Sequence, residues 1–422
     1  MFSNKFGARR TFSMALLGGF LTVSAMSSSG CAHRAALGGQ GGLGQGSAQV
    51  TSVEMEPLTL EVSKGEGGPQ IEAYDAPTLF EEGGQHMDGD RFAEAAASYE
   101  RLIVNFPDSP YVPPATFNAA LCYEGLGRYS DAAERYHRIT EVFSGAKVAK
   151  EATMRLGAVD AELGRWPASI EVYESALRRT DLNLSERIEA MSRRALGLFE
   201  IGDLQVAESS FRETVAYYAA HKEEERLDSG FFVAMAQFYH AHIAHRRFRE
   251  LPVRLPQKQL EQDIQAMSRQ FLITQERYVD AIKLKDPTWA SAAGFHVGAL
   301  YRELYDSLIK APLPPELDND LKKIIYSEML KGNLRNLLEK ARGILEKNVE
   351  MAGRVGIKNG WIEKSTVQLD EISKLLAALD DQPVGPSVAT PPGERRPPAP
   401  SNAAPRAPRQ RQPESIAPSG TL

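Results

Sequence analysis

A pattern that returns with a nearly constant period, about 37 residues, constrains the fold of this chain more than any other feature. In each copy, a small residue stands three positions after a large apolar or aromatic residue and four positions before an aromatic one. The small residues are Ala95, Ala132, Ser169 and Ala207; the residues before them are Phe92, Tyr129, Trp166 and Leu204, and those after them are Tyr99, Tyr136, Tyr173 and Phe211. A small residue between two large residues at these spacings is typical of a position where two helices cross closely. Repetition at this period predicts a stacked helical array.

Glycines mark the turn between the two helices of each unit. Gly127, Gly164 and Gly202 each stand two residues before the large residue that opens the second helix. Glycine suits a helix C-terminus because that position often needs a positive φ. Apolar residues recur at spacings of three and four on both sides of these turns, as amphipathic helices require. The pattern therefore predicts helical hairpins.

These positions resemble the tetratricopeptide repeat, with its Leu-Gly in the first helix, Gly before an aromatic at the turn, and Ala and Tyr in the second helix. The resemblance covers residues 76–222, and we expect four such repeats over 75–222. The family period is about 34 residues, so three or four extra residues separate the units here, as in Phe106–Pro110. The implied fold is an all-α solenoid of stacked helix hairpins with C-terminal capping helices and disordered tails.

Beyond residue 222 the pattern loosens but stays helical. Residues 223–310 form a divergent repeat-like region, with a long helix expected over about 257–284. The run Pro312–Pro315 breaks the chain, and residues 311–381 are expected to hold two closing helices, near 317–353 and 360–380. The segment 382–422 is rich in Pro, Ala and Arg and lacks aromatic residues. Because it cannot bury enough apolar surface, we expect it to be disordered.

The N-terminus resembles an export signal. Residues 1–30 combine a basic start, at Lys5, Arg9 and Arg10, with a short apolar stretch over Met14–Met26. Small residues before Cys31 resemble a bacterial lipoprotein cleavage site, which would make Cys31 the lipidated residue. Ser28 stands where that site usually carries Leu, so a plain secretory signal is the alternative. Arg9–Phe12 also resembles a twin-arginine signal, which leaves the export route undecided between the twin-arginine and general pathways. Residues 31–74 are expected to form a flexible tether.

The sequence offers no constellation typical of an enzyme. It lacks Gly-x-Ser-x-Gly, His-Glu-x-x-His and a phosphate-binding loop, and we expect no cofactor and no catalytic activity. Of His240, His242 and His245, only the last two share a helix face, so packing or surface roles are favoured over metal binding. The net charge of −6 argues against nucleic-acid binding. Cys122, in an apolar stretch, is expected to be a buried thiol.

Partner binding is the function that the repeat pattern predicts. Stacked hairpins generate a concave face lined by the first helix of each unit. The residues predicted to face a partner are Phe117, Asn118, Leu121, Glu124, Met154, Arg155, Ala158 and Arg193, together with Ser192 and Leu196. Their mixture of apolar and charged groups suits an extended peptide or a partner helix.

The architecture is similar to the tetratricopeptide lipoproteins of bacterial gliding-motility machinery. That similarity implies a scaffold on the periplasmic face of the outer membrane, held through Cys31 and bound to other envelope proteins; Ala32 gives no sign of retention at the inner membrane. The alternatives are an accessory lipoprotein for outer-membrane protein insertion or for secretin and pilus assembly, a polysaccharide-export scaffold, and, in another class, a cell-wall or polysaccharide-processing factor.

Overall fold

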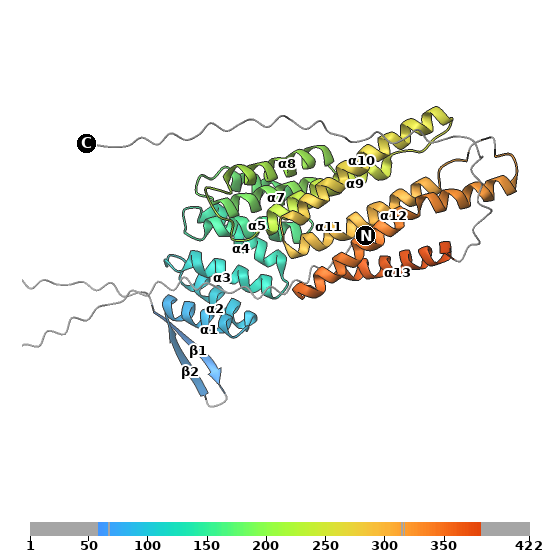
Figure 1. Ribbon diagram of the computed structural model, residues 1–422. Helices are drawn as coiled ribbons and strands as arrows, with labels where there is room; N and C mark the ends of the chain where they lie inside the picture. The colour runs from blue at the N-terminus through green and yellow to red at the C-terminus, as the bar shows by residue number, and fades with distance from the viewer. Residues whose placement is uncertain (1–57, 66–67, 314, 316, 381–422) are drawn as a thin grey trace, which may run out of the picture. The chain divides into compact units, whose positions relative to one another are not determined.

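The computed structural model describes residues 58–65, 68–313, 315 and 317–380 (Figure 1). The predicted signal peptide, Cys31, most of the tether and the C-terminal tail lie outside these residues. Helices dominate the described part, and the prediction of an all-α, repeat-type fold is confirmed. No helix in this part combines the length and apolar character needed to cross a bilayer.

Four helical hairpins follow one another over the predicted repeats. Each second helix packs on its own first helix and on the first helix of the next hairpin. The pairs are α1 (Ala76–Asp88) with α2 (Phe92–Asn105), α3 (Val112–Gly125) with α4 (Tyr129–Val142), α5 (Ala149–Glu162) with α6 (Trp166–Leu177), and α7 (Leu184–Glu200) with α8 (Leu204–His221). The turn glycines Gly127, Gly164 and Gly202 have φ of 71°, 71° and 88°, as the helix-end prediction requires.

The small residues of the repeat lie where the helices cross. Ala95, Ala132 and Ala207 have no exposed surface, and Ser169 is 1% exposed. The Ser169 hydroxyl donates to the Gly157 carbonyl across the hairpin at 2.7 Å. On the facing helix there is equally little room, because a Cβ added to Gly157 would lie 2.6 Å from a ring carbon of Tyr173. Close approach of the backbones therefore sets the geometry of each hairpin.

Strands replace the last part of the predicted tether. β1 (Thr59–Gly65) pairs antiparallel with β2 (Gly68–Tyr74), with Thr59 opposite Tyr74. Gly-rich residues near 38–47 favour a tether, but the residues of the two strands alternate between apolar and polar, which is a strand signal. Tyr74 joins the hairpin to the first repeat, since its ring lies edge-on against Phe106 and its hydroxyl accepts from Asn105 at 2.7 Å.

A second helical block follows the repeats. It consists of α9 (Phe231–Glu250), α10 (Gln257–Lys283), α11 (Pro287–Ile309), α12 (Asp320–Val355) and α13 (Gly360–Asp380). The long helix expected over 257–284 is α10, and the two closing helices are α12 and α13. Helix α12 packs along both α11 and α13 (Figure 1). Gly298 of α11 allows this contact, because a Cβ there would lie 2.6 Å from the Leu345 side chain of α12.

Glu208 of α8 joins the repeats to this block. Its carboxylate accepts from Arg277 of α10 at 2.8 Å and from Arg247 of α9 at 2.5 Å, and it lies 4.0 Å from His240. The hydrogen bonds and charges of both arginines hold the pKa of Glu208 below its ordinary value, against the opposing effect of burial. Arg247, together with Arg249 and Arg254, belongs to the densest basic run of the fold. Internal ion pairs occupy these three arginines, whereas Arg246 of the same run is exposed and lies 5.9 Å from the centre of the Phe199 ring.

Candidate functional site

The first helices of the central repeats present matching stripes of residues. In α5 the stripe is Glu151, Arg155, Ala158 and Glu162; in α7 it is Glu189, Arg193, Leu196 and Glu200. Each member of the α7 stripe stands one repeat after its counterpart in α5, and spacings of three and four keep each stripe on one side of its helix. Leu121 and Glu124 of α3 extend the surface. We call these ten residues the A-helix face.

Ion pairs connect the helices across this face. The Arg155 Nη1 donates to Glu124 of α3 at 3.3 Å, while its Nε donates to Glu151 of its own helix at 3.3 Å. One repeat later, Arg193 Nε donates to Glu189 at 2.7 Å. The Arg193 guanidinium also lies 4.9 Å from the centre of the Phe232 ring of α9. Arg155 therefore links α3 to α5, and Arg193 links α7 to α9.

Buried tyrosine hydroxyls form a second set of contacts, one between neighbouring hairpins and two within a hairpin. Tyr99 accepts from Asn118 of the next hairpin at 3.2 Å. Tyr136 donates to Glu124 at 2.5 Å, and Tyr173 donates to the Met154 carbonyl at 3.2 Å. Burial raises the pKa of Tyr99 to about 12, so it stays protonated at neutral pH. These tyrosines are the aromatic residues of the sequence repeat, and their hydroxyls help to hold the first helices of the hairpins in place.

The predicted partner-facing residues divide into two groups. Phe117 is 6% exposed and packs on Tyr136, and Ser192 is fully buried, with its hydroxyl donating to the Phe232 carbonyl at 3.0 Å. These two therefore belong to the packing between helices. The others are half-buried and lie on α3, α5 or α7: Asn118, Leu121, Glu124, Met154, Arg155, Ala158, Arg193 and Leu196.

Sequence reasoning missed four of the ten residues of the face. It selected the arginines and apolar members of the stripes but omitted Glu151, Glu162, Glu189 and Glu200. The signal was present, because the pattern Glu, Arg, apolar, Glu recurs at the same place in the next repeat. Aligning the repeats on every helix position, rather than on the small and aromatic residues alone, would have revealed it.

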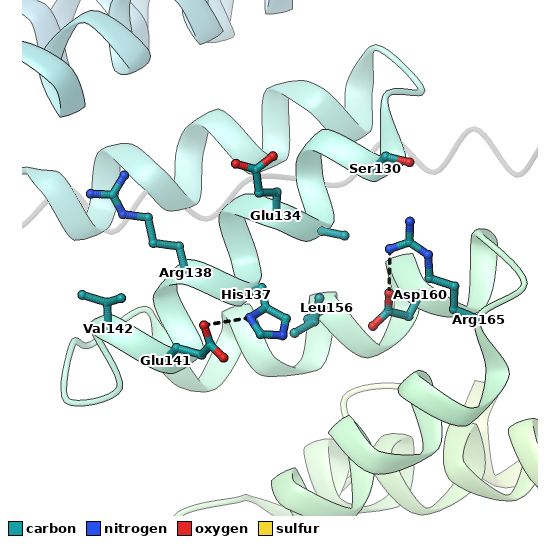
Figure 2. Close-up of a pocket in the computed structure, with 10 residues that line it drawn as sticks. Ser130, Glu134, His137, Arg138, Glu141, Val142, Leu156, Asp160 and Arg165 are labelled. Atoms are coloured by element: carbon teal, nitrogen blue, oxygen red, sulfur yellow. Dashed lines mark ion pairs between the residues drawn. The ribbon is translucent and has the colours of Figure 1, made fainter.

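A cleft lies elsewhere, between α4, α5 and the turn before α6 (Figure 2). Its volume is about 410 Å³, and Leu156 and Asp160 of α5 contribute to its lining. Asp160 lies 3.7 Å from Arg165, and His137 lies 3.1 Å from Glu141. Burial raises the pKa of Asp160 above its ordinary value. The residues that line the cleft offer no nucleophile paired with a base, so it does not suggest a reaction.

Histidines of the C-terminal block are packed among aromatic rings. The His242 and His245 rings both approach the Tyr278 hydroxyl, at 3.3 and 3.1 Å, as expected for side chains on one face of α9. His245 also contacts Glu303 of α11 at 3.0 Å. The ring of His296 stacks on Tyr278, and neither of its nitrogens has a hydrogen-bond partner. Within the described residues, no group of three or more His, Cys, Asp or Glu side chains is arranged to hold a metal ion.

Cys122 is a buried thiol, as predicted. It has no exposed surface, and burial raises its pKa to about 12. A thiol with such a pKa is protonated at neutral pH and is a poor nucleophile.

Comparisons with known proteins agree with the repeat geometry. Residues 117–183 and residues 79–109 each match a family model of the tetratricopeptide repeat. A comparison with curated protein sequences found no match.

Solved structures with similar folds are distant in sequence. A tetratricopeptide repeat protein from Parabacteroides merdae is 15% identical, with a TM-score of 0.33, and the match covers 72% of this chain and 98% of that one. The C-terminal part of a repeat-containing protein from Cytophaga hutchinsonii is 14% identical, with a TM-score of 0.37, covering 71% and 95%. A Rap protein complexed with competence and sporulation factor is 14% identical, with a TM-score of 0.32, covering 72% and 76%. The family models, which match at the hairpins themselves, carry the assignment: this chain contains tetratricopeptide repeats.

Proposed function

We propose that this protein is a non-catalytic scaffold that binds a segment of another protein along the A-helix face. The observation that carries the proposal is the repetition of the same charged and apolar stripe on α5 and α7. Repeated stripes give an extended partner equivalent contacts at successive positions, and half-buried apolar residues between charges suit a peptide or helix more than a small molecule. Tetratricopeptide repeats generally mediate protein–protein contacts.

Photo-crosslinking tests the face directly. A photoreactive phenylalanine analogue at Ala158, on the A-helix face, is expected to trap a partner protein in intact cells. The matched control carries the same analogue at Glu171, which is exposed on α6. Equal trapping at both positions would show that the A-helix face has no special role in binding.

We further propose that the protein is a lipoprotein on the periplasmic face of the outer membrane. The basic start, the short apolar stretch and Cys31 support this proposal. The likeness to gliding-motility lipoproteins suggests that the scaffold serves that machinery or a related envelope-spanning assembly. In this role the A-helix face would contact another envelope component.

Replacing the proposed lipidation site gives a clear expectation. The Cys31→Ser variant should move from the membrane fraction to the soluble fraction, because the anchor would be lost. Sedimentation of membranes followed by immunoblotting measures the change, and Cys122→Ser, at a buried thiol, is the matched control. A Cys31→Ser variant that still sediments with membranes would rule out the lipid anchor.

A further inference from the structure

The A-helix face carries an excess of negative charge. Its ten residues include five carboxylates and two guanidiniums, a net charge of −3 when all are ionised. The carboxylates are Glu124, Glu151, Glu162, Glu189 and Glu200. Because the stripes of α5 and α7 are equivalent, this charge is spread along successive repeats rather than gathered at one point.

Both guanidiniums on the face are already engaged. Glu124 and Glu151 bracket Arg155, and Arg193 lies between Glu189 and the Phe232 ring. An acidic partner would have to break these pairs and then face the remaining carboxylates. A basic partner can add to the same carboxylates, which still have unused acceptor positions. The face therefore selects for positive charge.

Positive charge is concentrated in one segment of this chain. Gly393–Gln412 contains five arginines and one glutamate, a net charge of +4, although the whole protein carries −6. Its prolines favour an extended conformation that loses little entropy on binding. Arginine also pairs with carboxylates through two parallel hydrogen bonds, which gives this segment geometric as well as electrostatic complementarity.

The chain is long enough for such contact. Helix α13 ends at Asp380, and Arg395 follows fifteen residues later. An extended stretch of that length spans about 50 Å. The longest helix, α12, has 36 residues and is therefore about 54 Å long. The extended linker is therefore about as long as the longest described helix. The arginines can reach surfaces well away from the end of α13.

We propose that Gly393–Gln412 binds the A-helix face and that an incoming partner must displace it. This inference rests on the proposed role of the face as a docking surface and adds the chemistry of its ligand, a basic and proline-rich segment. The tail competes with partners for the face from within the same molecule. A partner segment therefore occupies the face only if its affinity or its local concentration exceeds that of the tail.

A peptide titration tests this proposal. The probe is a fluorescent peptide of residues 393–412, and the receptor is the full chain with all five tail arginines changed to glutamine. We expect binding in fluorescence anisotropy that weakens at higher salt. The wild-type chain, whose own tail competes, should bind the peptide at least fivefold more weakly.

Charge reversal locates the binding surface. In the receptor with the glutamine tail, the double variant Glu162→Lys and Glu200→Lys should bind the peptide at least tenfold more weakly. The control, Glu171→Lys and Glu213→Lys, changes the net charge equally at exposed positions of α6 and α8 and should bind normally. Equal affinities for the two double variants would overturn the proposed site, and a wild-type chain that binds as tightly as the glutamine variant would overturn self-occupancy. If Ala158 still traps partner proteins while the peptide fails to bind, only the identity of the ligand is wrong.

Discussion

Replacing Gly157 with alanine will destabilise the third repeat by about 2 kcal/mol, because the added methyl group overpacks a closed hairpin. Its carbon would lie 2.6 Å from the Tyr173 ring. That ring is rigid and has no exposed surface, so it has nowhere to move. The better helix propensity of alanine, about 1 kcal/mol, offsets only part of the steric cost. Thermal unfolding followed by circular dichroism measures the difference.

The matched control is the same substitution in a different setting. Gly343 lies inside α12, and nothing would come within 4 Å of a Cβ added there. Gly343→Ala should therefore stabilise the protein by about 0.5–1 kcal/mol through reduced backbone entropy of the unfolded chain. If both variants shift the thermal midpoint in the same direction, the close contact between Gly157 and Tyr173 does not exist in solution.

Acid will destabilise the C-terminal block well above the pH at which carboxylates titrate. Burial lowers the pKa of His240 and of His242 to about 4, below the ordinary value of 6.5. The unfolded chain therefore binds more protons than the folded one below pH 6.5, and stability falls as the pH drops from 6.5 to 4. A pKa difference of this size corresponds to roughly 3 kcal/mol for each of these two histidines.

Other groups around the cluster act in the same direction. Burial lowers the pKa of His245 and of His296, although Glu303 opposes the change at His245. The groups that face His296 are His242, His245 and Arg249 from α9, Tyr278 from α10 and Lys364 from α13. A protonated His296 would be repelled by the positive charges of Arg249 and Lys364, and its ring nitrogens have no hydrogen-bond acceptor. Glu303, with a pKa of about 2 because of Arg249 and His245, contributes a separate loss below about pH 4.5.

Urea unfolding at several pH values measures this effect. Trp289 and Trp361 lie beside the cluster, with ring centres 5.1 Å from Phe238 and 5.2 Å from His296 respectively, so tryptophan fluorescence reports on it. We expect the urea midpoint to fall steadily between pH 6.5 and 4.5. His296→Phe should reduce this fall, because it removes a buried base while keeping an aromatic ring, whereas His137→Phe, at an exposed position, should not. A midpoint that is constant over this range would contradict the arrangement of the cluster.

The sequence was sufficient to predict features that depend on local spacing. The hairpins, the turn glycines and the buried aromatic residues all follow from the regular period of the sequence, because each repeat folds on its immediate neighbours. The long helix α10 was expected from the looser helical pattern beyond residue 222. The strands β1 and β2 were not predicted, because their alternation of apolar and polar residues is short and lies within the segment expected to be a tether.

Contacts between distant parts of the chain could not be predicted in this way. Glu303 and His245 are 58 residues apart in sequence, and nothing local pairs them. Arg193 was expected to face a partner, and the structure adds that it also lies against Phe232 of the next helix pair. Sequence periodicity identifies which side of a helix is polar, but it does not show which of those polar groups are already paired.

The side-chain contacts that reach from one repeat to the next, such as Asn118 to Tyr99 and Arg155 to Glu124, have a consequence for how the array melts. Each contact makes the folded state of one hairpin depend on its neighbour. The stability of the array then includes an interface free energy between neighbouring repeats as well as the stability of each repeat. When this interface free energy is large, the repeats unfold together instead of fraying from one end. A ligand bound at one repeat then also stabilises the repeats on either side. Partner binding would then be felt well beyond the residues that touch it.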